Sequence, residues 1–347
     1  MDDSKFGTED ARGYWKPIKS ISYGPFFEWP PKPKPLFKWF FGFPGYLLPW
    51  NLLYALAAII IWLYLTPPLE KMTTLKIDWI GFILLRNFIL LIAITGSWHL
   101  WLYVWRKQDT KFKYNRSWPN KKSKVFLFSN QTYDNMFWTL VSGVPIWTTY
   151  EVLLLWAYAN GIAPMINFNE HPIGFVALFF LIPFIRDAHF YLTHRLLHWG
   201  PLYRIAHKVH HRNTNTGPWS GMSMHPIEHI LYFSGILIHW VIPSHPLIAM
   251  FHIFHAGIAP TAGHTGYEKM VFKNGKYIQT GDYNHYLHHK FFECNYSGGN
   301  VSFLDKLFGT FHNGSEESTQ EVMKRIDSYD IALQFVLEEL DAAIQGD

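Results

Sequence analysis

The chain has 347 residues and a formal net charge of +4, and 49% of its residues are hydrophobic while only 16% are charged. That charged share is below the roughly 25% of ordinary soluble domains, and so small a net charge does not favour binding to nucleic acid. The single cysteine, Cys294, excludes intramolecular disulfides, so an oxidising, exported environment has no support.

Residues 1–45 are predicted to form a cytoplasmic arm that lies along the membrane surface or packs against the catalytic region. The first residues lack the apolar stretch of a cleavable signal peptide. The segment Trp29-Pro-Pro-Lys-Pro-Lys-Pro35 favours extended chain over helix, because proline lacks an N–H group and restricts the residue before it.

Residues 46–185 are predicted to hold the transmembrane helices. A membrane-spanning helix needs about 20 predominantly apolar residues. Four segments meet this requirement, at about 46–65, 79–104, 137–159 and 172–191. We therefore expect an all-α, polytopic integral membrane protein with about four transmembrane helices.

The basic residues indicate the orientation of these spans. The N-terminal arm and the loop between the second and third spans are both basic, and the positive-inside rule places both in the cytoplasm. With four spans, the histidine-rich region that follows also lies there, as a helical cytoplasmic cap. The apolar stretch 230–262 is broken by Pro243 and Pro246, which predicts a re-entrant or interfacial helix pair.

Three histidine clusters follow the fourth span, His194-Arg-Leu-Leu-His198, His207-Lys-Val-His210-His211 and His285-Tyr-Leu-His288-His289. Residues i and i+4 share one face of a helix, with Cβ atoms about 5–6 Å apart, so two imidazoles at this spacing can bind one metal. The adjacent histidines of an HxxHH cluster diverge by about 100°, so one cluster can supply two ions, or one ion from two sides. Eight imidazoles exceed the four to six ligands of a single ion, which predicts two ions.

The identity of the metal follows less directly. Imidazole suits zinc, copper, iron and nickel. A zinc hydrolase of the His-Glu-x-x-His type needs glutamate after the first histidine, whereas here Arg195 follows His194. A centre built mostly from histidine favours iron and oxygen chemistry, although zinc could occupy the same site.

The segment from about Asp187 to Thr310 resembles the fatty acid hydroxylase superfamily, which includes sterol desaturases and C-4 methylsterol oxidases. The three histidine boxes match in order and approximate spacing. Three accessory motifs also match, His225-Pro-Ile-Glu228, His264-Thr-Gly-Tyr267 and Leu307-Phe-Gly-Thr310. The family often has Asn-Tyr-Gly after the last box, where this chain has Asn295-Tyr-Ser-Gly-Gly299.

The residues and the resemblance together give the candidate site. Ten histidines are predicted metal ligands, His194, His198, His207, His210, His211, His225, His264, His285, His288 and His289. A metal-bound imidazole normally passes its other N–H to a carboxylate or carbonyl. Asp187, Glu228 and Asp282 are therefore the candidate catalytic carboxylates, with Asp305 as a further partner. Residues 186–312 form the expected catalytic region, and an amphipathic helix is predicted within 313–347.

The resemblance implies a non-haem di-iron oxygenase of lipid metabolism. Such an enzyme hydroxylates or desaturates an unactivated C–H bond of a sterol or fatty acyl lipid with O2 and two electrons. The chain has no flavin, dinucleotide or haem motif. A separate electron donor is expected, such as a ferredoxin, a b-type cytochrome or a reductase. The membrane is that of the endoplasmic reticulum or the bacterial inner membrane. A zinc-dependent lipid hydrolase is the alternative, and a metal or proton transporter is disfavoured because the spans carry almost no charge.

Overall fold

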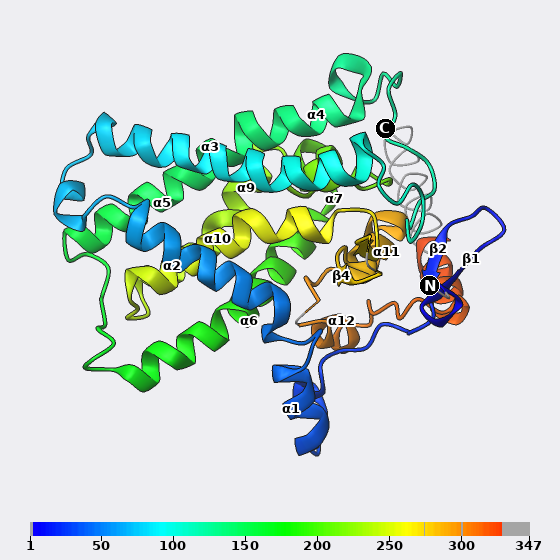
Figure 1. The fold of residues 1–347 in the computed structure, drawn as a ribbon, viewed down its shortest axis with the longest axis horizontal. Coiled ribbons are helices and arrows are strands. Elements are labelled where there is room, and N and C mark those ends of the chain that lie inside the picture. Colours follow the sequence, from blue (N-terminus) through cyan, green and yellow to red (C-terminus); the bar gives the residue numbers. More distant parts are fainter. Residues whose placement is uncertain (1–2, 274, 300, 328–347) are drawn as a thin grey trace, which may run out of the picture.

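The computed structural model describes residues 3–273, 275–299 and 301–327 (Figure 1). The α-helices of the N-terminal half are α1 (Pro33–Phe41), α2 (Leu52–Tyr64), α3 (Ile77–His99), α4 (Gln131–Phe137), α5 (Val144–Ala159) and α6 (Pro172–Leu197). Those that follow are α7 (Gly200–Leu202), α8 (Lys208–His211), α9 (Pro226–Phe233), α10 (Pro246–Gly263), α11 (Tyr283–Phe291) and α12 (Phe303–Leu307). Two short antiparallel hairpins pair β1 (Gly7–Glu9) with β2 (Trp15–Pro17) and β3 (Lys269–Val271) with β4 (Tyr277–Gln279).

Four helical segments are long and apolar enough to cross a membrane, which confirms the prediction of a polytopic helical membrane protein. They are Leu47–Tyr64, Ile77–Val104, Gln131–Ala159 and Pro172–Leu197. Short π-helical stretches lengthen the first three beyond their α-helices. The fourth continues past its predicted end at 191, so the first histidine cluster lies on the last turns of a spanning helix.

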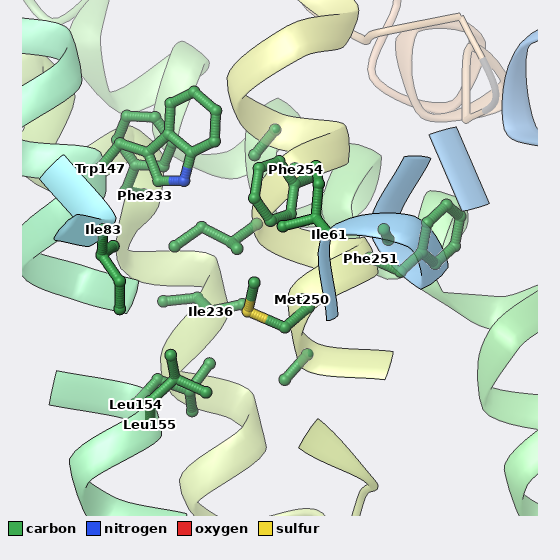
Figure 2. Packing of buried hydrophobic residues seen from close by; sticks show 14 of the residues in the cluster. Ile61, Ile83, Trp147, Leu154, Leu155, Phe233, Ile236, Met250, Phe251 and Phe254 are labelled. Carbon is green, nitrogen blue, oxygen red and sulfur yellow. The ribbon is translucent and has the colours of Figure 1, made fainter. Parts of the chain in front are cut away.

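Helix α10 lies at the centre of the bundle and packs against α2, α3, α5 and α6 (Figure 1). Most of its side chains are buried, which explains why its sequence is apolar on every face. Figure 2 shows the main core cluster, in which Phe254 of α10 packs edge-to-face against Trp147 of α5 with ring centroids 5.2 Å apart. The predicted break in the stretch 230–262 is present, because helical structure stops at Trp240 and resumes at Pro246.

The two charges inside the second and third predicted spans neutralise each other. Arg86 of α3 forms a buried ion pair with Glu151 of α5. Asn87 Nδ2 also donates to Glu151 Oε2 at 2.9 Å and to Thr148 Oγ1 at 3.1 Å. An isolated charge in the hydrocarbon region is costly, so this pairing turns both residues towards the bundle interior rather than towards lipid.

The N-terminal arm packs on the same end of the bundle as α11 and α12 (Figure 1). The Trp15 N–H donates to the Lys113 carbonyl at 3.1 Å, and Phe27 stacks on Phe303 with centroids 4.1 Å apart. The expectation of extended chain up to Pro35 is wrong, since α1 begins at Pro33. Prolines are tolerated in a first helical turn because those N–H groups have no partner within the helix.

The C-terminal prediction is tested only in part. Residues 316–327 are helical, and Val322 is buried while most of its neighbours are exposed. This pattern agrees with an amphipathic helix that packs one face on the cap. The remainder of the predicted segment, 328–347, lies outside the described residues.

Candidate metal centre

Four segments bring the histidines together at one end of the bundle. The end of α6 carries His194 and His198. The π-helical turn Tyr203–His207 and α8 carry the second cluster, and α11 carries the third. His264 lies at the C-terminal cap of α10, so the central helix of the core also contributes to the site.

Nine of the ten candidate ligands form two groups in which the nitrogen atoms lie within 4.8 Å of one another. The five-histidine group consists of His194, His198, His207, His211 and His288. The four-histidine group consists of His210, His264, His285 and His289. Only histidines occur in either group among the described residues, and all but His198 are buried.

The division of each HxxHH cluster follows helix geometry. His285 and His289 are four residues apart and share a group, whereas His288 belongs to the other group. His207 and His211 likewise separate from His210. Residues at i and i+4 lie on one face, and the adjacent position points about 100° away. Each cluster therefore contributes to both groups.

The Nε2 atoms converge at a spacing that suits metal coordination. In the four-histidine group, Nε2 of His264 lies 3.2 Å from that of His289 and 3.1 Å from that of His285. In the five-histidine group, Nε2 of His288 lies 3.0 Å from that of His211. Metal–nitrogen bonds of about 2.0–2.1 Å place neighbouring ligand nitrogens roughly 3.0–3.4 Å apart.

Nδ1 of His207 lies 2.8 Å from the carboxyl group of Glu228, whose pKa burial raises well above its usual value. The second ring nitrogen fixes the tautomer of four other imidazoles. Nδ1 of each faces a backbone carbonyl at 2.6–3.3 Å: His194 that of Tyr296, His288 that of Cys294, His210 that of Ser223, and His264 that of Pro260. Nδ1 must therefore carry the proton in the neutral ring, which leaves Nε2 as a bare lone pair. Lone pairs that converge without a proton repel unless a cation lies between them, so the residues fit a metal ion in each group.

Burial keeps these imidazoles neutral, as metal binding requires. Removal from water lowers the pKa of His210 to about 4 and that of His264 to about 3. Burial also lowers the pKa of His288 well below its usual value, and the neighbouring His198 adds to this by charge repulsion. The site thus offers lone pairs rather than imidazolium groups at neutral pH.

The three candidate carboxylates occupy different positions. Glu228 Oε1 lies 2.8 Å from His207 Nδ1, which is the arrangement that orients a metal-bound imidazole. Asp187 Oδ1 accepts from Arg186 Nη1 at 2.8 Å. Asp282 caps α11, where its Oδ1 accepts the Asn284 N–H at 2.9 Å, and burial raises its pKa to about 6.

His225 does not join either group. It caps α9, and its Nδ1 accepts the Ile227 N–H at 3.3 Å. His229 lies between Ser142 Oγ at 2.9 Å and the Met222 carbonyl at 3.2 Å, and His189 Nε2 lies 3.0 Å from Ser234 Oγ. These rings serve packing and hydrogen bonding around the groups.

The segment 294–297 is the part of the site that sequence reasoning did not identify. Its carbonyls at Cys294 and Tyr296 hold His288 and His194. Asp305 holds the segment in place, because its carboxylate accepts the N–H groups of Tyr296 at 2.8 Å and Ser297 at 3.0 Å. Backbone carbonyls leave no signature in a sequence. The signals were the Asn295-Tyr-Ser segment after the last histidine box, where the family often has Asn-Tyr-Gly, and the proximity of Asp305.

A cavity of about 290 Å³ adjoins the four-histidine group. His210, His264 and His285 line it at the metal centre, and α10 forms one wall. We call this space the α10 cavity. Apolar and aromatic side chains such as Trp39, Phe190 and Met224 line much of the remainder. None of the five-histidine group lines it.

Comparison with known proteins agrees with this geometry. Residues 179–310 match the family model for fatty acid hydroxylase, and this range contains all nine grouped histidines. A Delta(7)-sterol 5(6)-desaturase of Saccharomyces cerevisiae is 29% identical over 152 residues, which is 42% of this chain and 39% of that protein. A methylsterol monooxygenase of Aspergillus fumigatus is 30% identical over 161 residues, which is 43% of this chain and 50% of that protein.

A C-4 methylsterol oxidase of Schizosaccharomyces pombe is 33% identical over 134 residues, which is 35% of this chain and 42% of that protein. The chain thus spans about half the length, or less, of these relatives. No solved structure matches the chain significantly.

Proposed function

We propose that the chain is a membrane-bound oxygenase with two iron ions, because residues 179–310 match the family model for fatty acid hydroxylase. Its reaction is the hydroxylation or desaturation of an unactivated C–H bond of a sterol or fatty acyl lipid with O2 and two electrons. The observation that carries this proposal is the pair of all-histidine groups, of which one lines an apolar cavity. Iron supplies the activation of O2 when it is bound.

The protein's own residues position the metal and the substrate. Hydrogen bonds from Nδ1 to Glu228 and to the carbonyls of Tyr296 and Cys294 aim the Nε2 lone pairs of the five-histidine group. The four-histidine group faces the α10 cavity, so the substrate C–H bond lies nearest to this group. The apolar lining excludes water and suits a lipid that enters from the bilayer.

The surface near His198 supports an external electron donor. His198 is the one grouped ligand that is partly exposed, and Trp199 beside it is 61% exposed. Exposed basic side chains lie close by in sequence, namely Arg195, Arg204 and Lys208. Such a surface favours a donor with an acidic face, as a ferredoxin or a b-type cytochrome can offer.

The orientation in the membrane follows from the basic loop. Residues 106–124 carry eight lysine and arginine residues and lie at the same end of the spans as the histidine groups (Figure 1). The positive-inside rule then places the metal centre on the cytoplasmic side of the endoplasmic reticulum or of a bacterial inner membrane.

Metal analysis of the detergent-purified protein tests the proposal. We expect about two irons per chain after growth in iron-supplied medium, and His288→Ala should lose at least one of them. His171→Ala is the matched control, because His171 is exposed and belongs to neither group. The protein, reduced by ferredoxin and its reductase, is then incubated with lipid extract under isotopically labelled O2.

Labelled alcohols or new double bonds in the lipid would support an oxygenase. Zinc that persists in iron-rich medium, together with O2-independent cleavage of a lipid ester or amide, would instead favour the hydrolase.

A further inference from the structure

The α10 cavity has a polar pair on its wall that the metal centre does not use. Asn51, directly before α2, and His255 of α10 both line the cavity. Their side chains meet at 2.8 Å between Asn51 Oδ1 and His255 Nε2. Both residues are buried, with His255 only 3% exposed. Burying a polar pair in an apolar cavity is costly unless its groups are hydrogen-bonded. Each polar atom of the pair is therefore expected to have a hydrogen-bond partner.

The hydrogen bonds fix which nitrogen of His255 carries the proton. The Asn51 amide donates from Nδ2 to the Tyr46 carbonyl at 2.7 Å, which turns its Oδ1 towards His255. An amide oxygen only accepts, so His255 Nε2 must donate. Burial disfavours the doubly protonated ring. Nδ1 is therefore a bare acceptor, and it has no hydrogen-bond partner within the part of the chain that the structure describes.

A bare acceptor on the wall of the cavity matches a ligand that donates a hydrogen bond. Among lipid head groups, a hydroxyl donates a hydrogen bond, whereas an ester, an ether and a carboxylate only accept. The charges nearby do not favour an acid either. Arg186, the cation that lines the cavity, is paired with Asp187 at 2.8 Å, and its Nη2 donates to the Tyr232 hydroxyl at 3.0 Å. A carboxylate would thus meet a cation that is already neutralised.

We propose that His255 Nδ1 accepts a hydrogen bond from a hydroxyl group of the lipid and thereby selects alcohol-bearing lipids over acids, esters and ethers. This inference rests on the proposed function in one respect only, namely that the cavity holds the lipid to be oxidised. His255 acts as a specificity-determining residue at a distance from the metal centre.

The geometry of α10 sets the separation between the hydroxyl and the metal centre. His255, Ala259 and Gly263 line the cavity at four-residue spacing, so they form one stripe along the helix. From His255 to Gly263 the axial rise is about 12 Å. The small side chains of Ala259 and Gly263 leave room along this stripe. The hydroxyl thus binds several bonds away from the carbon that meets the four-histidine group.

Equilibrium binding to the iron-loaded protein in phosphatidylcholine nanodiscs tests the proposal. Anaerobic conditions without a reductant prevent turnover, so the measurement does not depend on oxygenase activity. The probes are palmityl alcohol, its methyl ether and palmitate, together with cholesterol and its methyl ether. We expect the wild type to bind at least one of the alcohols about tenfold more tightly than its methyl ether, which corresponds to about 1.4 kcal/mol.

Three variants refine this comparison. His255→Leu should bind the preferred alcohol as weakly as its ether, with ether affinity unchanged. His245→Leu is the matched control, because His245 caps the same helix and does not line the cavity. Ala259→Leu narrows the cavity and should weaken alcohol and ether alike.

Equal binding of alcohol and ether by the wild type would overturn the proposal without any variant. Tighter binding of palmitate than of either alcohol, or an alcohol preference that survives in folded His255→Leu protein, would also overturn it. If the alcohol preference is present but neither a labelled alcohol nor a new double bond forms in the lipid, the proposed function fails while the hydroxyl site stands. If the lipid is oxidised but the protein shows no preference for alcohols, the hydroxyl site fails while the proposed function stands.

Discussion

The five-histidine and four-histidine groups use the same side chain in two different surroundings. The five-histidine group reaches the surface through His198 and contacts Glu228 through His207. The four-histidine group is fully buried and lines the α10 cavity. An octahedral ion would have one further coordination position beside the five histidines and two beside the four. We infer that the four-histidine group meets substrate and O2, and that the five-histidine group lies on the route by which electrons enter.

Removing one ligand from each group tests this division most severely. His264→Ala and His288→Ala should each reduce metal content from about two ions per chain to about one. Oxygenation should fall by more than the 10–100-fold that loss of an outer hydrogen-bond partner costs. The measurement is metal analysis beside turnover, with His171→Ala as the control. If each variant lost both ions, the groups would form one cooperative site and the comparison would fail.

The pH dependence of the stability of the metal-free protein tests whether burial keeps the imidazoles of the four-histidine group neutral. The pKa of His210 is lowered to about 4 and that of His264 to about 3, so the unfolded chain binds more protons than the folded chain below pH 6.5. Stability is therefore fully present above pH 6.5 and decreases as pH falls. At pH 5 each such imidazole lowers the free energy of unfolding by about 2 kcal/mol, because it is protonated in the unfolded chain but not in the folded chain.

Thermal unfolding of metal-free protein in detergent, measured from about pH 7.5 to about pH 5 on either side of the ordinary histidine pKa of about 6.5, would show this loss. The iron-loaded protein is the comparison, because bound metal holds the lone pairs and should flatten the curve until the metal leaves. A metal-free protein whose stability does not change over this range would contradict neutral, buried imidazoles.

Changing Glu228 should distinguish the groups more finely. In Glu228→Gln the side chain can still accept from His207 Nδ1, but the negative charge is lost. We expect the metal affinity of the five-histidine group to fall by about 10–100-fold, with the four-histidine group unaffected. Competition with a chelator, followed by metal analysis, measures each affinity.

Asp282→Asn is the matched carboxylate control. It keeps a helix-capping side chain on α11, where the Asp282 carboxylate accepts the backbone N–H groups of Asn284 and His285 rather than an imidazole N–H. It should lower the free energy of unfolding by less than about 1 kcal/mol and leave metal affinity unchanged. An equal effect of both variants on metal would show that Glu228 has no special role.

The comparison of the groups also shows what the sequence could predict. Helical periodicity is sufficient to expect that the adjacent His210 and His211 diverge by about 100° and can serve two ions, because the angle between side chains depends only on position along the helix. Four apolar segments likewise predicted the spans, because the thickness of the bilayer sets their length.

Features that depend on tertiary contacts were not predictable. The carbonyls that hold His194 and His288 come from a loop whose path depends on Asp305. The choice of Glu228 rather than Asp187 as partner of a grouped histidine depends on how α9 packs beside the turn Tyr203–His207. His225 has a motif position that suggested a ligand, but Pro226 begins a helix there and the ring caps it instead.

The smallest effect that we expect concerns electron entry near His198. Arg204 and Lys208 are exposed and belong to the segment that carries His207 and His211. Replacing both by glutamine removes two positive charges and should slow reduction by an acidic donor about three- to tenfold at low salt, because rim charges act mainly on association rate. Stopped-flow reduction by ferredoxin at two salt concentrations measures this. Lys76→Gln, in the exposed loop between the first two spans, is the control and should have no effect. A reduction rate that changes with neither salt nor the double substitution would place electron entry elsewhere. The five-histidine group would then not lie on the electron route, and the two groups would differ only in their surroundings.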